Sequence, residues 1–223
     1  KAYIYTEDWA DAKTTLKDVI DNSGKSLMDF NSYKNMFNGD NSLKFNNESI
    51  YEISMDVDKT TWGAWGPSTG SGIGMVISPC YMNDDASTGA SGWSNTFVHD
   101  KNLARFGFNQ PVYTFVPNPA YDPSKDISID NQKTICDPAY VATSKSLRDN
   151  KLVDPRLWVS CLEPYVDSMI ATDKVTRTRP IVHYQSVESN YYAWSFRKYV
   201  NLKGSEYDLN VNNGSDFYWL RLA

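Results

Sequence analysis

The sequence ends in Asp216-Phe217-Tyr218-Trp219-Leu220-Arg221-Leu222-Ala223, a stretch that predicts the first turns of an α-helix. Its first residue, or Ser215 before it, is the expected helix cap, and the apolar residues that follow begin a hydrophobic face. About two turns are too short to be stable as an isolated helix. We therefore expect these 223 residues to be a section of a larger protein.

The composition is that of a folded protein with many aromatic residues. Hydrophobic residues make up 41% and charged residues 22% of the chain, which argues against intrinsic disorder. The seven Trp and fifteen Tyr suit surfaces that are partly apolar and partly hydrogen-bonding. A net charge of −5 without a basic run argues against a nucleic-acid partner. No stretch of 18 apolar residues occurs, so we expect no membrane-spanning helix.

Residues that carry common catalytic chemistry are few. Cys80, Cys136 and Cys161 are odd in number and widely spaced, which argues against a disulfide framework or a zinc site. His99 and His183 lie in no known nucleophile or zinc-helix motif. Nothing nominates one pair among the 27 acidic residues for glycoside cleavage. We expect neither enzyme activity nor a cofactor.

The clearest predicted helix covers residues 6–24, with Thr6 as its N-cap and Gly24 as its left-handed end. Five apolar residues recur there at helical spacing: Trp9, Ala12, Leu16, Val19 and Ile20. Residues 50–57 then alternate as a strand does. The alternation predicts an apolar face with Tyr51 and Ile53 and a polar face with Glu52.

From about residue 58 to 135 the sequence is rich in Gly, Ser, Thr, Asn, Asp and Pro with scattered aromatic residues. Such a length without periodicity indicates a functional surface or disorder, and the aromatic content favours the surface. A helix is predicted from Asp137-Pro138 to about Asp149. Short strands are expected over 157–162, 181–186 and 191–200.

Several landmarks occur in one order along the chain. They are Asp8-Trp9-Ala10-Asp11-Ala12, Asn47-Glu48-Ser49-Ile50-Tyr51-Glu52-Ile53, Asp154-Pro155-Arg156, Arg197-Lys198-Tyr199 and Leu220-Arg221-Leu222-Ala223. The series resembles the SusD/RagB family of bacterial outer-membrane nutrient-binding lipoproteins, and the match covers nearly the whole chain.

The resemblance implies a mainly α fold: a tetratricopeptide-like helical scaffold, a long loop-rich segment and a few short antiparallel strands. Residues 1–223 would form one partial domain. It would consist of the end of the helical-repeat part and the first strand (1–57), a ligand-binding insertion (58–215) and the start of the next scaffold helix (216–223). The lipid-modified cysteine of the family would lie outside this section.

The resemblance further implies a non-enzymatic protein on the outer face of the bacterial outer membrane. Such a protein captures glycans and delivers them to a TonB-dependent, SusC-like transporter. Some members capture peptides instead, and the sequence alone also leaves open a carbohydrate-active enzyme or a structural surface protein.

The expected ligand-binding residues lie in the irregular segment. Sugars present flat C–H faces and hydroxyl edges, which suit indole rings beside short polar side chains. The candidates are Trp62, Trp65, Tyr81, Asn83, Asp84 and Trp93. The alternative is that these rings pack the loops onto the core. Asn83-Asp84-Asp85 offers oxygen ligands for Ca²⁺, but adjacent acidic loop residues are more often solvated, so we expect no metal.

Three arginines are expected to support the fold. In Asp154-Pro155-Arg156 the carboxylate is expected to accept backbone amides while the guanidinium makes a bidentate contact elsewhere. Arg197 and Arg221 are expected to be fold-supporting charges as well.

Overall fold

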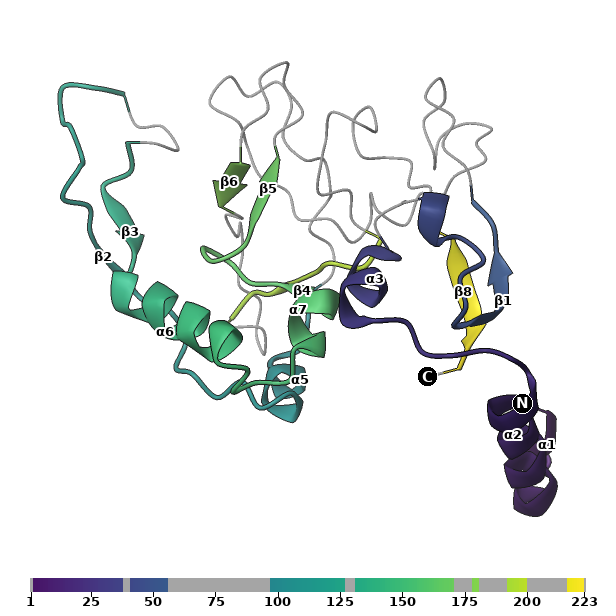
Figure 1. Ribbon diagram of the computed structural model, residues 1–223. Helices are drawn as coiled ribbons and strands as arrows, with labels where there is room; N and C mark the ends of the chain where they lie inside the picture. Colours follow the sequence, from purple (N-terminus) through teal and green to yellow (C-terminus); the bar gives the residue numbers. More distant parts are fainter. Residues whose placement is uncertain are drawn as a thin grey trace.

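The computed structural model describes residues 2–37, 41–55, 97–126, 131–170, 178–180, 192–199 and 216–222, with the backbone alone for 168–170 and 178–180. Within these ranges short helices and two-stranded antiparallel sheets alternate along the chain (Figure 1). Helices α1 and α2 project away from the other described elements.

The predicted first helix is present but begins later than expected. Helix α2 covers Trp9–Asn22 and follows a short helix, α1 (Ala2–Tyr5). The cap is Asp8, whose carboxylate accepts the amide three residues on at 3.2 Å. Thr6 cannot cap α2 because it lies in the turn that closes α1. Gly24 takes the predicted left-handed conformation, with φ of +70°.

The last described element is a strand, so the predicted terminal helix is wrong. Strand β8 (Phe217–Arg221) pairs antiparallel with β1 (Ser49–Ile53). Alternate side chains of a strand point to opposite faces. Tyr218 consequently packs edge-on against Phe37, at 5.7 Å between ring centroids. It also donates its hydroxyl to the carbonyl of Met36 at 3.2 Å.

The polar face of β1 is the buried one, opposite to the prediction. Glu52 is buried whereas Tyr51 and Ile53 are exposed. Its carboxylate accepts the amide of Phe45. Its other carboxylate oxygen is buried without a hydrogen-bond partner in the described structure, so this face carries a costly buried group that alternation alone does not reveal.

The remaining elements form the larger part of the described structure. They are α3 (Phe30–Asn35), η1 (Asn41–Leu43), α5 (Asp100–Arg105), β2 (Phe115–Pro117), β3 (Thr134–Cys136), α6 (Pro138–Asp149), α7 (Arg156–Ser160), β4 (Cys161–Leu162), β5 (Ser168–Ile170), β6 (Thr178–Pro180) and β7 (Ser195–Phe196). The paired strands are β2 with β3, β4 with β7, and β5 with β6.

The helix predicted from Asp137-Pro138 to about Asp149 is present as α6, whereas the strand predicted over 157–162 is mostly the helix α7. Asp137 caps α6, and its carboxylate accepts the Ala139 amide at 2.8 Å. Residues 157–162 were predicted as a strand, but most of them belong to α7 and only Cys161–Leu162 are extended. Leu157, Trp158 and Val159 are all buried, and a short apolar run of this kind does not distinguish a strand from a buried helix.

Two hydrophobic clusters hold these elements together. The larger joins α5, α6, α7, β3, β4 and the segment before β7; its buried members are Val98, Leu103, Phe108, Cys136, Tyr140, Val153, Leu157, Trp158, Cys161 and Trp194. The smaller consists of Met36, Phe37 and Val159 and connects α3 and α7, with Tyr199 and Tyr218 packed against it. Helix α3 and strand β8 thereby contact the same core.

The predicted tetratricopeptide-like scaffold is wrong for the described part of the chain. Its helices are short, and the only helix pair in extensive contact there is α1 with α2. Stacked helix pairs, which define a helical repeat, are not formed by these residues. The core is built instead from aromatic side chains on short helices, two-stranded sheets and loops, which is a mixed architecture with small antiparallel sheets.

Candidate functional site

The six predicted ligand residues, Trp62, Trp65, Tyr81, Asn83, Asp84 and Trp93, lie outside the described residues. The chain on either side of their segment is well anchored. Strand β1 precedes it and pairs with β8. Val98 follows it, is buried, and donates its amide to the carbonyl of Trp194 at 2.8 Å. The segment is therefore held at both ends by packed elements.

The most extensive polar cluster in the described structure surrounds Glu163, which is 0% exposed. Its carboxylate accepts the hydroxyls of Ser144 and Tyr140 at 2.5 and 3.0 Å. It also accepts the guanidinium of Arg148 at 2.7 Å and the indole N–H of Trp158 at 3.4 Å. Burial and the charge of Glu163 both raise the pKa of Tyr140.

Arg148 connects Glu163 to a second carboxylate, Asp167. The two terminal nitrogens of Arg148 lie 2.6 and 3.0 Å from the Asp167 oxygens. Asp167 also accepts the backbone amide of Glu163 at 2.6 Å. Burial acts to lower the pKa of Arg148, but its hydrogen bonds and charge interactions with the two carboxylates outweigh burial and raise it. The network is closely paired and stabilises the junction of α6 with β4.

Two further cations, Lys34 and Arg197, form no ion pair among the described residues. Lys34 is on α3 and Arg197 directly follows β7, and both are partly buried. Burial, and next the positive charge of Arg197, lower the pKa of Lys34. Burial also lowers the pKa of Arg197, with Asp167 opposing and Arg148 adding to the effect.

The arginines expected to support the fold behave differently from one another. Arg221 pairs with Glu48 at 2.8 Å, as expected. Arg156 makes a bidentate contact, but with Asp154 itself and not elsewhere. Asp154 also accepts the Arg156 amide at 2.9 Å, as expected. Arg197 has no carboxylate at ion-pair distance among the described residues, and its Nε is buried without a hydrogen-bond partner. Its role as a fold-supporting charge stays a prediction.

Sequence analysis missed the contact between α3 and the segment after β7, because these two parts are far apart in the chain. The Tyr199 amide donates to the carbonyl of Phe37 at 3.3 Å, and the Lys198 ammonium donates to the Tyr33 hydroxyl at 3.2 Å. No local sequence motif predicts such a contact.

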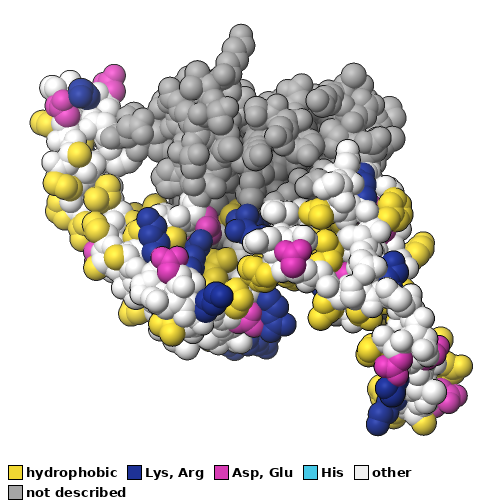
Figure 2. Space-filling model, in the orientation of Figure 1, with side chains coloured by type: hydrophobic (Ala, Val, Ile, Leu, Met, Phe, Trp, Pro, Cys, Tyr) yellow, Lys and Arg dark blue, Asp and Glu magenta, His cyan; other side chains and the backbone are white. Residues whose placement is uncertain are grey.

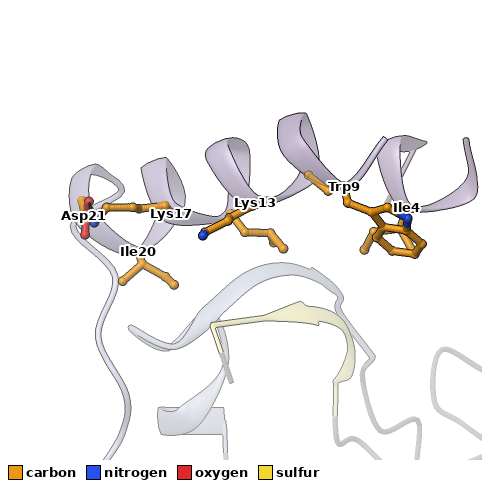
Figure 3. A pocket seen from close by; sticks show the side chains of 8 residues that line it. Ile4, Trp9, Lys13, Lys17, Ile20 and Asp21 are labelled. Atoms are coloured by element: carbon orange, nitrogen blue, oxygen red, sulfur yellow. Dashed lines mark hydrogen bonds and ion pairs between the residues drawn. The ribbon is translucent and has the colours of Figure 1, made fainter. Parts of the chain in front are cut away.

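The projecting helices carry a shallow apolar groove of about 590 Å³. It is lined by Ile4, Trp9, Ala12, Lys13, Leu16, Lys17, Ile20 and Asp21. Figure 3 shows the labelled side chains directed to the same side of α2, with Ile4 of α1 beside Trp9. Hydrophobic side chains accordingly reach the surface over α1 and α2 (Figure 2).

The groove provides apolar contact but few polar groups. Trp9 is 63% exposed on it. Lys17 and Asp21 pair with each other at 2.5 Å, so Lys13 is left as its one charged side chain without a partner in the described structure. A small-molecule site usually combines an apolar wall with several convergent polar groups. The groove therefore resembles a packing surface more than a site for a polar ligand.

Other exposed aromatic rings occur on the strands. Trp219 of β8 is 52% exposed and lies 5.8 Å from the ring of Phe217. Phe115 of β2 is half exposed and packs edge-on against Tyr165 at 5.3 Å. The half-exposed ring of Phe115, fixed by its neighbour, offers an apolar face at the surface.

The described part of the chain contains one histidine and two cysteines. The Nδ1 of His99 accepts the Lys101 amide at 3.1 Å and caps α5. Cys136 and Cys161 are free and buried, and burial raises their thiol pKa values to about 11 and about 12. Within the described ranges no three His, Cys, Asp or Glu side chains come together to hold a metal.

Searches against family models, curated proteins and solved structures find no match for this chain. Among the described helices, none combines the length and the apolar character required to cross a membrane.

Proposed function

We propose that this protein is a non-enzymatic binding protein that captures glycans at the surface of the bacterial outer membrane for uptake through a TonB-dependent transporter. The proposal rests on the ordered motifs that resemble the SusD/RagB family and not on a helical-repeat scaffold. A lipid anchor outside this section and a SusC-like barrel as the partner belong to the same proposal.

One structural observation adds support to the proposal: packed structure precedes and follows the segment that contains Trp62, Trp65 and Trp93. Strand β1 pairs with β8 before it, and buried Val98 joins the core after it. Binding residues often lie on loops that a rigid framework positions. Indole rings in such a segment supply large, stiff faces that suit the C–H faces of sugars.

Calorimetric titration of oligosaccharides into the protein tests this function. We expect binding that at least one of Trp62→Ala, Trp65→Ala and Trp93→Ala weakens about tenfold or more, because loss of a stacked ring removes buried apolar area. Trp9→Ala is the matched control, since this exposed indole lies on α2, outside the segment. Equal affinity in all four variants would remove the segment from the binding site.

Two further measurements distinguish the rival functions. A peptide library screened under the same conditions would favour peptide capture if peptides bind and glycans do not. Chromogenic glycosides would show an enzyme if turnover occurs and one carboxylate substitution abolishes it. The proposal predicts glycan binding without turnover.

A further inference from the structure

Two buried carboxylates, Glu52 and Asp216, meet where β1 and β8 lie side by side (Figure 1). Glu52 is opposite Tyr218 in the strand register, and Asp216 lies two residues before Tyr218. Side chains two residues apart in a strand point to the same face, and diagonal neighbours across an antiparallel pair are within reach of each other. The two carboxylates are therefore neighbours on one face of the strand pair.

The chain directly after η1 contacts both carboxylates. The amide of Phe45 donates to Oε1 of Glu52, and the ammonium of Lys44 lies 3.2 Å from Oδ1 of Asp216. Oδ1 of Asp216 also accepts the Met55 amide at 2.8 Å. One oxygen of each carboxylate is thus well satisfied.

The second oxygen of each carboxylate is not satisfied. Oε2 of Glu52 and Oδ2 of Asp216 are buried without a hydrogen-bond partner in the described structure. Buried polar atoms are nearly always hydrogen-bonded, and an exception needs an explanation. An ionised carboxylate only accepts hydrogen bonds, whereas a protonated one has a hydroxyl that donates. A proton on one of the two groups would therefore satisfy both orphaned oxygens.

The charges around the pair also leave room for one proton. Lys44 supplies one positive charge against two carboxylates. Tyr218 adds no charge, because burial and next the charge of Glu52 raise the pKa of its phenol. At the other end of the strand pair, Arg221 is held by Glu48, whose Oε1 lies 2.8 Å from a guanidinium nitrogen. One negative charge is left over at Glu52 and Asp216.

We propose that Glu52 and Asp216 share one proton and make the pairing of β8 with β1 a pH-sensitive clasp, closed at acidic pH and loosened as the pH rises. When the proton leaves for the solvent, two negative charges face each other in a buried place with one ammonium between them and water. Like charges in such surroundings repel strongly. Separation of β8 from β1 relieves the repulsion.

The direction of the effect follows from the shift at Glu52. Burial, and next the hydrogen bond with Asp216, raise the pKa of Glu52 above its ordinary value of 4.5. The stability that the shared proton contributes is fully present below that ordinary value and is lost as the pH rises through the raised pKa. Between the two values, opening of the clasp releases one proton, so its equilibrium constant rises about tenfold for each pH unit.

The clasp controls two contacts of β8. Tyr218 packs edge-on against Phe37 and donates its hydroxyl to the carbonyl of Met36 at 3.2 Å. Loosening of β8 would therefore uncover the smaller hydrophobic cluster. Because β1 also precedes the segment with the candidate ligand residues, pH would act on the anchor of that segment. This inference holds whether or not the protein binds glycans.

Hydrogen exchange read by mass spectrometry tests the clasp in the parent protein. After correction for the intrinsic exchange rate at each pH, we expect the protection of the β1 and β8 amides to fall about tenfold or more between pH 5 and pH 8, relative to those of α6. Protection of β1 and β8 that follows α6 at every pH would overturn the proposal.

Two variants and a matched control give the test its specificity. In Glu52→Gln and in Asp216→Asn the new amide donates where the shared proton did, so the protection of β1 and β8 should no longer depend on pH. If Asp216→Asn does not fold, because Lys44 loses an anionic partner, Glu52→Gln carries the same comparison. Glu48→Gln removes a buried carboxylate that has its own arginine, and it should keep the pH dependence of the parent. The same pH dependence in Glu52→Gln as in Glu48→Gln would contradict the shared proton.

A direct signature of the proton comes from infrared spectroscopy. We expect a carbonyl band of a protonated carboxyl group at pH 6 that is absent in Glu52→Gln and present in Glu48→Gln. A spectrum without this band would contradict the proposal. Calcium chloride at constant ionic strength should leave the melting temperature at pH 8 unchanged. A saturable rise that Glu52→Gln abolishes would show that a cation, and not a proton, balances the two carboxylates, and would overturn the clasp.

Discussion

The Glu163 network provides the sharpest test of what holds the described structure together. In Glu163→Gln the amide oxygen can still accept Arg148 and Trp158, while the amide nitrogen can donate to the hydroxyls of Ser144 and Tyr140. Shape and hydrogen-bond number are conserved, and the negative charge is lost. The contact with Arg148, at 2.7 Å, is then no longer between two charges.

Hydrogen bonds to charged groups contribute about 1.5–3 kcal/mol, against about 1 kcal/mol for neutral ones. Arg148 keeps its bidentate contact with Asp167, so we expect Glu163→Gln to lower the free energy of unfolding by about 2 kcal/mol. For a chain of this size that corresponds to a fall in melting temperature of roughly 4–8 °C. Glu163→Ala should cost more, about 3–5 kcal/mol, because a buried charge loses one partner completely.

Urea unfolding followed by tryptophan fluorescence measures both losses. Asp21→Asn is the control, because it removes an exposed ion pair at 2.5 Å on α2. Such pairs contribute about 0.3–0.5 kcal/mol. If Glu163→Gln costs no more than Asp21→Asn, the buried network does not stabilise the junction of α6 and β4, and the reasoning fails.

Three further outcomes are expected. Asp137→Ala removes the cap of α6 and should lower the free energy of unfolding by about 1 kcal/mol, measured by urea unfolding; an unchanged midpoint would contradict the role of the cap. Burial raises the pKa of Glu52, so its contribution to stability is fully present below the ordinary value near 4.5 and is lost as the pH rises above it. Glu52→Gln should therefore gain stability relative to the parent as the pH rises from 4 to 8, and parallel pH profiles in thermal melts would refute this. In a Cys80→Ser background, the thiols of Cys136 and Cys161 should not react with a disulfide reagent at pH 8 until urea unfolds the protein; rapid reaction without urea would show that they are accessible.

Local signals predicted some elements well. Asp137 followed by Pro138 predicted the start of α6, because a side-chain cap and a proline at the first helical position act within a few residues. Gly24 predicted the end of α2, and it has the expected left-handed conformation. Both features depend on the backbone near the residue itself, and sequence alone captures them.

Features set by distant contacts were not predicted. Residues 217–221 have apolar side chains that suit a helix, but pairing with β1 and packing of Tyr218 on Phe37 make them a strand. The buried face of β1 carries Glu52, whose one carboxylate oxygen accepts the Phe45 amide while the other has no hydrogen-bond partner in the described structure, and alternation along the strand does not show this. The helical-repeat scaffold was expected from the family resemblance, and in the described structure Trp9, Leu16 and Ile20 of its first helix, α2, are exposed instead of packed on a second repeat.

The candidate site also has features that local sequence predicts and features that depend on distant contacts. A Trp-rich irregular segment is visible in composition, and its candidate ligand residues remain a prediction. The contact between α3 and the segment after β7 was not predicted, because the two parts are far apart in the chain and no local motif marks it.

Native electrophoresis through gels that contain a polysaccharide tests the central claim most directly, because a glycan-binding protein is retarded in proportion to its affinity. The account predicts that at least one polysaccharide retards the protein and its Trp9→Ala control. The triple variant Trp62→Ala, Trp65→Ala, Trp93→Ala should run freely in the same gel. Equal retardation of the triple variant, or free migration of the parent protein through every acidic and neutral polysaccharide, would contradict it.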